Sequence, residues 1–144
     1  MSGTDLSILC VADSAAVAQS VQRWVRESPD LSWVGWIATA GEIEAAINVL
    51  GARLVLLGRV LPDLELADLI GRLAERSPPV RVAMLMEDAA RGDVERSLHA
   101  GAAGYLAVGD PGPVLAAQVR EIGLGRTVLS ANARAALDGS SPHA

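Results

Sequence analysis

The sequence predicts an α/β fold, a doubly wound sheet of five parallel strands with helices on both faces. Short apolar runs alternate five times with stretches of helical spacing along the chain. The run at 54–57 (LVLL) is continuously apolar, which is typical of a central parallel strand covered on both faces. Hydrophobic residues make up 51% of the chain but aromatic ones only 3%, so the core must consist mainly of Leu, Val, Ile and Ala.

The first half of the chain supplies three of the predicted strands, at 6–12, 31–38 and 54–57. A helix begins near residue 15, because the apolar side chains there recur at i, i+4, i+7 and i+8: Val17, Val21, Trp24 and Val25. Asp13 or Ser14 can cap this helix. A second helix with apolar positions between 43 and 50 ends at Gly51.

The second half repeats the alternation. Helices are predicted around 66–73, 90–98 and 115–122, and strands at 80–86 and 104–108. Residues 1–126 are expected to form one domain. Residues 127–144 are expected to hold a short C-terminal helix near 130–137, followed by a polar tail or the start of a linker.

The charge of the chain bounds its partners. The net charge is −5, from 12 basic and 17 acidic residues, which argues against binding to nucleic acid or to an anionic membrane surface by this domain. All the basic residues are Arg, so lysine-dependent chemistry is excluded. No stretch approaches the roughly 20 apolar residues of a membrane span, and the N-terminus has no signal-peptide pattern, so a cytoplasmic location is expected.

The residues that support enzyme chemistry are scarce. No dinucleotide-binding glycine pattern follows the first strand, and no nucleophile elbow is present. Cys10 lies in an apolar run, His99 at the end of a helix and His143 in the tail, and three residues so placed cannot form a zinc shell. The sequence predicts no enzyme activity, no cofactor and no metal.

Several segments in order resemble the receiver domain of bacterial response regulators, in particular the NarL/LuxR-type branch that carries a C-terminal helix-turn-helix. The resemblance covers about residues 6–130, and the segments are ILCVADSAAVAQSVQRWV, SPDLSWVGWIATAGE, ARLVLLGRVLP, HAGAAGYLAV and GRTVLS. It implies the (βα)5 flavodoxin-like receiver fold, with strand order 2-1-3-4-5.

The same resemblance identifies a degenerate phosphorylation pocket. Receiver domains have an acidic pair after strand one, an aspartate that ends strand three, a hydroxyl residue that ends strand four and a lysine that ends strand five. Carboxylates of this kind hold Mg²⁺, and the metal and the lysine neutralise the transferred phosphoryl group. In this sequence the acidic pair is matched by Ala12 and Asp13, and the phosphoacceptor position by Gly58. The hydroxyl position is matched by Met86 and the lysine position by Val108. Val60 matches a further position, which offers its backbone carbonyl to the metal in the family. The resemblance therefore implies a receiver without a phosphoacceptor.

Two interpretations of this loss stay open. The site has decayed because it is unused, or its apolar replacements close the old cavity as additional core, which is often neutral or stabilising. The vacated pocket is expected to be uncharged apart from Asp13, whose expected role is the helix cap. Arg59 can pair with Asp13, and Glu87 and Asp88 are interpreted as a polar lead-in to the fourth helix rather than a metal site.

The function is then expected to lie in surfaces. Tyr105 matches the aromatic residue that reports phosphorylation at the partner-binding face of typical receivers, although a half-buried strand aromatic is the alternative. Trp33 and Trp36 are three residues apart, so they share a face only if their strand bulges, and Trp36 is the expected partner anchor. Leu115, Val119 and Ile122, with Val114, are predicted to offer a dimer face.

Three functions follow from these expectations. The first is a phosphorylation-independent response regulator, a homodimer that controls its own C-terminal DNA-binding output domain beyond residue 144. The second is a stand-alone adaptor that docks on another signalling protein. The third is a small-molecule sensor that uses the apolar remnant of the phosphate pocket.

Overall fold

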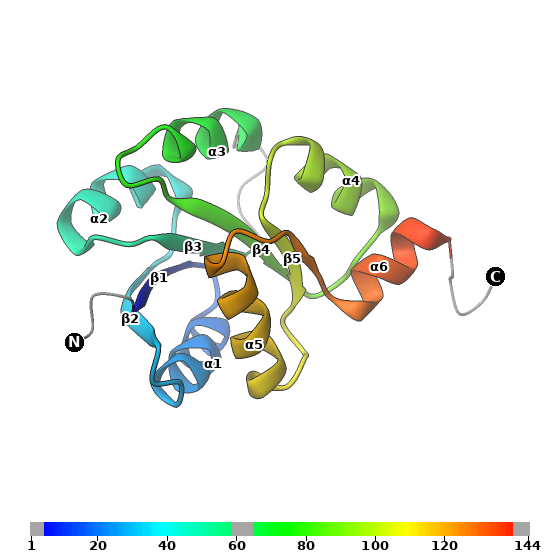
Figure 1. Cartoon of the computed structure of the whole chain (residues 1–144), viewed down its shortest axis with the longest axis horizontal. Coiled ribbons are helices and arrows are strands. Elements are labelled where there is room, and N and C mark those ends of the chain that lie inside the picture. The colour runs from blue at the N-terminus through cyan, green and yellow to red at the C-terminus, as the bar shows by residue number, and fades with distance from the viewer. Residues whose placement is uncertain (1–4, 59–64, 140–144) are drawn as a thin grey trace.

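The computed structural model describes residues 5–58 and 65–139 and contains a six-stranded parallel sheet with strand order β2-β1-β3-β4-β5-β6 (Figure 1). The strands are β1 (Leu6–Val11), β2 (Leu31–Ile37), β3 (Leu54–Leu57), β4 (Arg81–Met86), β5 (Gly104–Ala107) and β6 (Val128–Leu129). The helices are α1 (Ala15–Arg26), α2 (Ile43–Leu50), α3 (Leu66–Ala74), α4 (Arg91–His99), α5 (Gly112–Gly123) and α6 (Ala131–Asp138), with a 3₁₀ turn at Ala40–Glu42. The predicted doubly wound fold and strand order are confirmed, and the five predicted strands agree within one residue at either end. The sixth strand was not predicted.

The sheet separates two hydrophobic layers. Helices α1 and α5 cover one face, and α2, α3 and α4 cover the other (Figure 1). Successive residues of β1 alternate between the layers, with Ile8 and Cys10 facing α1 and α5, and Leu9 and Val11 facing the other helices. Because both faces are covered, the central strands are apolar throughout, and β3 is buried over its whole length.

The chain after residue 126 belongs to the same packed unit. Strand β6 pairs in parallel with β5, and α6 packs against α4 and β5. The Oγ of Ser130 accepts a hydrogen bond from the Ala133 amide at 3.2 Å and caps α6, and both residues are fully buried. The predicted short helix is thus present as α6, docked onto the sheet edge rather than standing apart as a tail.

Helix α1 begins at the carboxyl end of β1 and is capped by Ser14. Its Oγ accepts a hydrogen bond from the Val17 amide at 3.3 Å. Asp13 is exposed and makes no capping bond, so the expectation that Asp13 caps the helix is wrong. Ser14 rather than Asp13 is the residue directly before the first helical turn, and its extended backbone directs its side-chain oxygen toward the free amides of that turn.

Strand β2 contains a bulge that settles the orientation of its two tryptophans. Trp33 pairs with Ile8, but the next residue of β1 pairs with Gly35, so Val34 is the additional residue. After the bulge, Trp36 pairs with Cys10 and therefore faces the same side as Trp33. Trp33 is half-buried against the α1 layer, whereas Trp36 is 42% exposed, and its role as a partner anchor stays a prediction.

The apolar stripe of α5 is used by the core. Leu115, Val119 and Ile122 are at most 2% exposed and pack in the layer shared with α1. The prediction that these three residues form a dimer face is wrong, because a helix on a doubly wound sheet buries its widest apolar stripe against the strands. Val114 lies outside that stripe and is 42% exposed.

Among the helices of the described ranges, none has the length and the apolar character needed to cross a membrane.

Candidate functional site

A hollow of about 420 Å³ lies at the carboxyl ends of β1, β3, β4 and β5, where doubly wound folds place their sites. Its lining comes from the strand ends and from the first turns of α1 and α4: Ala12, Asp13, Ser14, Val17, Gly58, Leu85, Met86, Glu87, Asp88, Asp93 and Val108. Five of the six predicted pocket positions line it. The sixth, Val60, lies outside the described residues, as do Arg59 and its predicted pairing with Asp13.

Gly58 forms the floor of the hollow at the end of β3. It is buried, and its amide donates a hydrogen bond to the carbonyl of Val11 at 2.7 Å. A Cβ on Gly58 would lie 3.3 Å from that same oxygen and 3.4 Å from the Cβ of Ala12. The residue at the expected phosphoacceptor position therefore has no side chain, and a Cβ there would be in close contact with the end of β1.

Met86 and Val108 occupy the positions where a hydroxyl and a lysine are expected. The Val108 amide donates a hydrogen bond to the Met86 carbonyl at 2.9 Å, which joins the ends of β4 and β5. Their side chains are half-buried and pack sideways, Met86 against the α2–α4 layer and Val108 against the α1–α5 layer. These replacements do not fill the hollow, so closure by added core is wrong for the described side chains.

The rim of the hollow is acidic. Glu87, Asp88 and Asp93 line it together with Asp13, and no basic side chain of the described chain is among the lining residues. The expectation of a pocket uncharged apart from Asp13 is wrong, because the β4–α4 loop and the first turn of α4 bring three more carboxylates. Asp93 is paired with Arg96. Over residues 5–58 and 65–139, no group of three or more His, Cys, Asp or Glu side chains lies close enough to hold a metal ion.

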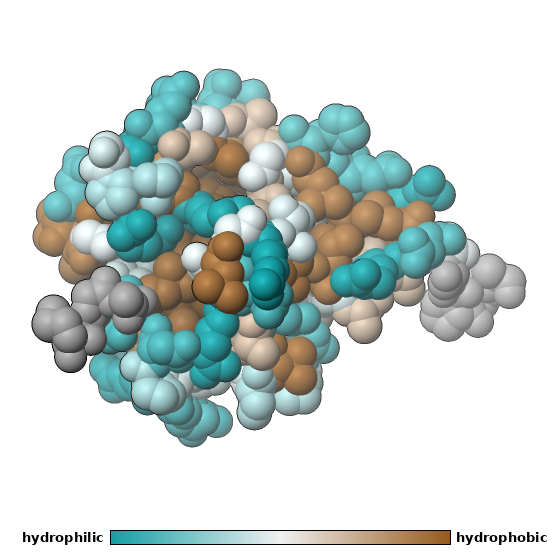
Figure 2. All heavy atoms as spheres, in the orientation of Figure 1, coloured by the Kyte–Doolittle hydropathy of each residue, from teal (hydrophilic) through white to brown (hydrophobic). Residues whose placement is uncertain are grey.

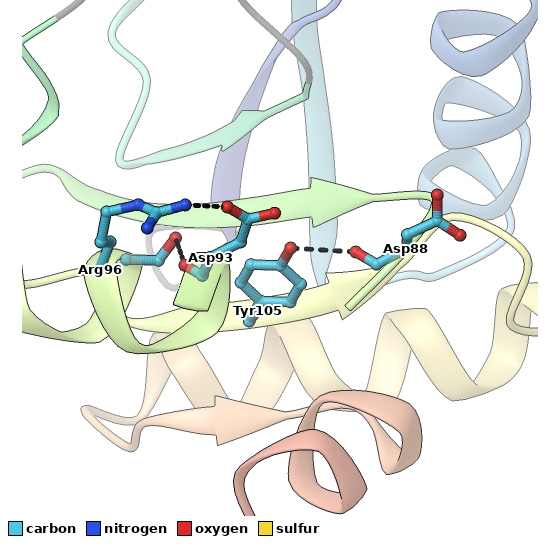
Figure 3. A network of polar contacts seen from close by, with 5 residues as sticks. Asp88, Asp93, Arg96 and Tyr105 are labelled. Carbon is cyan, nitrogen blue, oxygen red and sulfur yellow. Dashed lines mark hydrogen bonds and ion pairs between the residues drawn. The ribbon is translucent and has the colours of Figure 1, made fainter. Parts of the chain in front are cut away.

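Tyr105 connects β5 to this rim. Its ring is 2% exposed and its hydroxyl donates a hydrogen bond to the backbone carbonyl of Asp88 at 3.0 Å (Figure 3). Burial raises the pKa of Tyr105, the carboxylates of Asp93 and Asp88 raise it further, and Arg96 lowers it. The phenol therefore stays protonated and remains a donor. Tyr105 is fully buried rather than half-buried, and it fixes the loop that carries two of the rim carboxylates.

Two further contacts were not foreseen in the sequence. The indole Nε1 of Trp36 donates a hydrogen bond to the carbonyl of Ala12 at 2.8 Å, so the exposed tryptophan is tied to a lining residue from the neighbouring strand. Asp93 reaches the rim from the first turn of α4, which no strand-end rule identifies. For the rim carboxylates beyond Asp13, a sequence signal existed only for Glu87 and Asp88, which directly follow the predicted fourth strand.

The remaining candidate nucleophiles are structural. Cys10 is 1% exposed in the middle of β1, and burial raises the pKa of its thiol to about 12, which leaves it neutral and unreactive near pH 7. His99 is exposed in the last turn of α4, where a ring nitrogen lies 3.3 Å from the Glu95 carbonyl. Neither residue lines the hollow.

Comparisons with known proteins agree with this geometry. No protein-family model matches the chain. The DNA-binding transcriptional activator DevR/DosR of Mycobacterium tuberculosis is 27% identical over 132 residues, which is 92% of this chain and 61% of the activator. The chain thus spans about three fifths of the length of that curated relative.

Solved structures extend the comparison. A LuxR-family two-component response regulator from Aurantimonas sp. superposes with a TM-score of 0.81 at 18% identity, over 94% of this chain and 97% of that one. The non-phosphorylated receiver domain of the stress response regulator RcsB from Escherichia coli gives 0.75 at 11% identity, over 88% and 98%. The chain therefore has the fold of a response-regulator receiver domain, and its similarity in sequence and structure is to regulators of the LuxR and RcsB type.

Proposed function

We propose that the chain is a receiver-type regulatory module of the LuxR branch that works without phosphorylation and acts through protein contacts. The observation that carries the proposal is Gly58. It lies at the end of β3 on the floor of the hollow and has no side chain to accept a phosphoryl group.

The surroundings of Gly58 support the same conclusion. Phosphoryl transfer needs positive charge to neutralise the transferred group. Val108 and Met86 supply none, and the four rim carboxylates would repel a phosphoryl donor. In the part of the chain that the structure describes, those carboxylates form no group of three or more that could hold a metal ion.

The output of the module is proposed from its relatives. The similar activator is named for DNA binding, and the chain spans 61% of its length. We infer that a DNA-binding output domain follows residue 144 in the same polypeptide and that the module dimerises. We further infer that α6 carries the connection, because it packs against α4 and β5 and is the last helix of the described chain. A reading frame that stops after Ala144 would instead favour an adaptor that docks on another signalling protein.

The proposal is tested by incubation with acetyl phosphate and Mg²⁺, followed by intact-mass measurement. The expected result is an unchanged mass, while a receiver with the acceptor aspartate, treated in parallel, gains one phosphoryl group. A gain in this chain that survives Asp13→Ala would overturn the assignment, because Asp13 is the one carboxylate at a family pocket position.

A small-molecule sensor is the second candidate, favoured by the hollow itself. Its floor is apolar, from Ala12, Val17, Leu85, Met86 and Val108, and its rim is acidic. This combination fits a compact organic cation with an apolar body rather than the purely apolar ligand expected from the sequence. At a fixed concentration, ligands of that class should raise the melting temperature, and tighter-binding ligands should raise it more, by an amount that grows with the logarithm of affinity. The stabilisation should weaken in Asp88→Asn, which keeps the backbone carbonyl that Tyr105 binds.

A further inference from the structure

Helix α6 is held to the domain by little buried apolar surface. Of its eight residues only Ala133 is fully buried, while Ala135, Ala136 and Leu137 are half-buried. Every other α-helix of the described chain fully buries at least one Val, Ile, Leu or Trp side chain. Because the free energy of docking grows with the apolar area removed from water, α6 is bound more weakly than its neighbours.

The sequence of α6 favours a helix more than it favours docking. Four of its eight residues are Ala, which has the highest helix propensity but offers only a methyl group for packing. Helices shorter than about 12–15 residues are nevertheless marginal in water on their own. α6 is therefore a stable helix only while it is docked, and its residues favour re-forming the helix after release.

The two ends of α6 are held differently. The amide of Ser130, which is 0% exposed, donates a hydrogen bond to the Tyr105 carbonyl at 2.9 Å, and its Oγ accepts one from the Ala133 amide at 3.2 Å. At the other end Asp138 is exposed in the last turn, where a negative charge opposes the helix dipole, and Gly139 follows with a φ of 72°. Ser130 is thus the boundary between the sheet and a helix that is fixed at its first turn.

The contact between α6 and the domain reaches the molecular surface. α6 packs against α4 and β5, and Figure 2 shows apolar atoms where α4 and α6 of Figure 1 meet, with hydrophilic atoms on either side. The hydrophobic layer at this edge contains Leu98 of α4, Leu129 of β6 and Leu137 of α6, and all three are half-buried. Separation at this contact therefore leaves the fully buried core of the sheet intact.

We propose that α6 is a releasable helix, which opens by local unfolding from Ser130 onward while the sheet, α4 and α5 stay folded. Segments with few buried contacts are the ones that open locally in folded proteins. In the docked state α6 covers one side of α4 and β5 and is an autoinhibitory contact there. In the released state that side is accessible, and the output domain is joined to the receiver by a flexible segment. This effect on an output domain rests on the proposed function, whereas the opening is a property of this chain alone.

The test is hydrogen exchange of the full chain, measured by mass spectrometry at several urea concentrations below the unfolding transition. Peptides from α6 should exchange faster than peptides from β1 and α5, at a rate that urea barely changes, because local opening exposes little surface. Ser130→Ala removes the cap oxygen but keeps the amide that binds Tyr105, and it should raise the exchange rate of α6 about fivefold. Gly139→Ala should raise it as well, because its Cβ meets no atom within 4 Å and only the left-handed backbone becomes unfavourable.

Ser14→Ala is the matched control, because it removes the same kind of cap from α1, which buries four side chains. It should leave the exchange of α6 unchanged, since α1 is folded in both the docked and the released state. If α6 opened only when the whole chain unfolds, Ser14→Ala would accelerate α6 as much as Ser130→Ala does, and that result would overturn the inference. Exchange of α6 as slow as that of β1 would overturn it too.

These results are separate from the test of the proposed function. Slow exchange of α6 together with an unchanged mass after acetyl phosphate excludes the releasable helix and leaves a phosphorylation-independent module. Fast, urea-insensitive exchange of α6 in a chain that gains a phosphoryl group has the opposite meaning.

Discussion

Tyr105→Phe tests whether the buried phenol holds the acidic rim in place. The substitution removes only the hydroxyl that donates to the Asp88 carbonyl at 3.0 Å, and the ring remains in the core, 2% exposed. A hydrogen bond of this kind contributes about 0.5–1.5 kcal/mol net. Because Asp88 is exposed, water can take over the freed carbonyl, and we expect a loss of about 1 kcal/mol in the free energy of unfolding.

The assay is urea unfolding at pH 7 with linear extrapolation, in which the midpoint should fall and the slope should stay constant. Amide exchange should increase at Asp88 and its neighbours but not in β1. Tyr105→Ala is the reference for loss of the whole ring, which should cost about 3–5 kcal/mol. A stability for Tyr105→Phe equal to that of the wild type, with unchanged exchange at the loop, would refute the role assigned to the hydroxyl.

The alkaline range gives a second check on the same residue. Burial and the nearby carboxylates raise the pKa of Tyr105 in the folded chain. The unfolded chain therefore releases the phenolic proton first, and the stability held in the protonated form is lost as pH rises above about 10. Tyr105→Phe has no such proton, so its deficit relative to the wild type should shrink above that pH. A deficit that stays constant up to pH 11 would contradict the raised pKa.

Three further predictions concern the strands and caps around the hollow. Gly58→Asp introduces a carboxylate at the expected acceptor position and should be less stable than Gly58→Ala by about 2 kcal/mol at pH 7. The reason is that the new carboxylate enters an acidic hollow without a described basic partner. The stabilities of the two variants should converge at pH 4, as carboxylates become protonated. Equal stability at pH 7 would count against the acidic rim. Cys10 should resist thiol reagents in the folded chain, and above about pH 9 its buried thiol, with a pKa of about 12, should reduce stability by about 1.4 kcal/mol per pH unit, an effect absent in Cys10→Ala. Ser14→Ala should cost about 1 kcal/mol in thermal unfolding and Asp13→Ala close to nothing, and the reverse order would return the α1 cap to Asp13.

The fold could be predicted from the sequence because its signals are local. The continuous apolar run of β3 indicates a strand that is buried on both faces. The spacing of Val17, Val21 and Trp24 in α1 indicates a helix that is buried along one stripe. Each pattern is contained in a single short segment of the sequence. The identity of Gly58, the residue that follows β3, was also visible there, and a glycine has no side chain in any structure. A single segment does not show how many apolar residues of a helix pack into the core. For that reason Leu115, Val119 and Ile122 were predicted to lie on a surface, although they are buried.

The state of the site, by contrast, depends on residues that meet only in the folded chain. Asp93 reaches the rim from α4, Trp36 binds the Ala12 carbonyl across a strand, and Tyr105 binds the Asp88 carbonyl from β5. None of these contacts has a periodic signature, because hydrogen bonds between distant segments are set by strand order and by the bulge in β2. The sequence by itself determined the receiver fold and the presence of Gly58, which has no side chain, at the end of its third strand. The tertiary structure decided that the hollow is open and acidic, because this depends on which side chains from distant segments meet at the strand ends. It also decided that β2 is an edge strand, because this depends on the strand order.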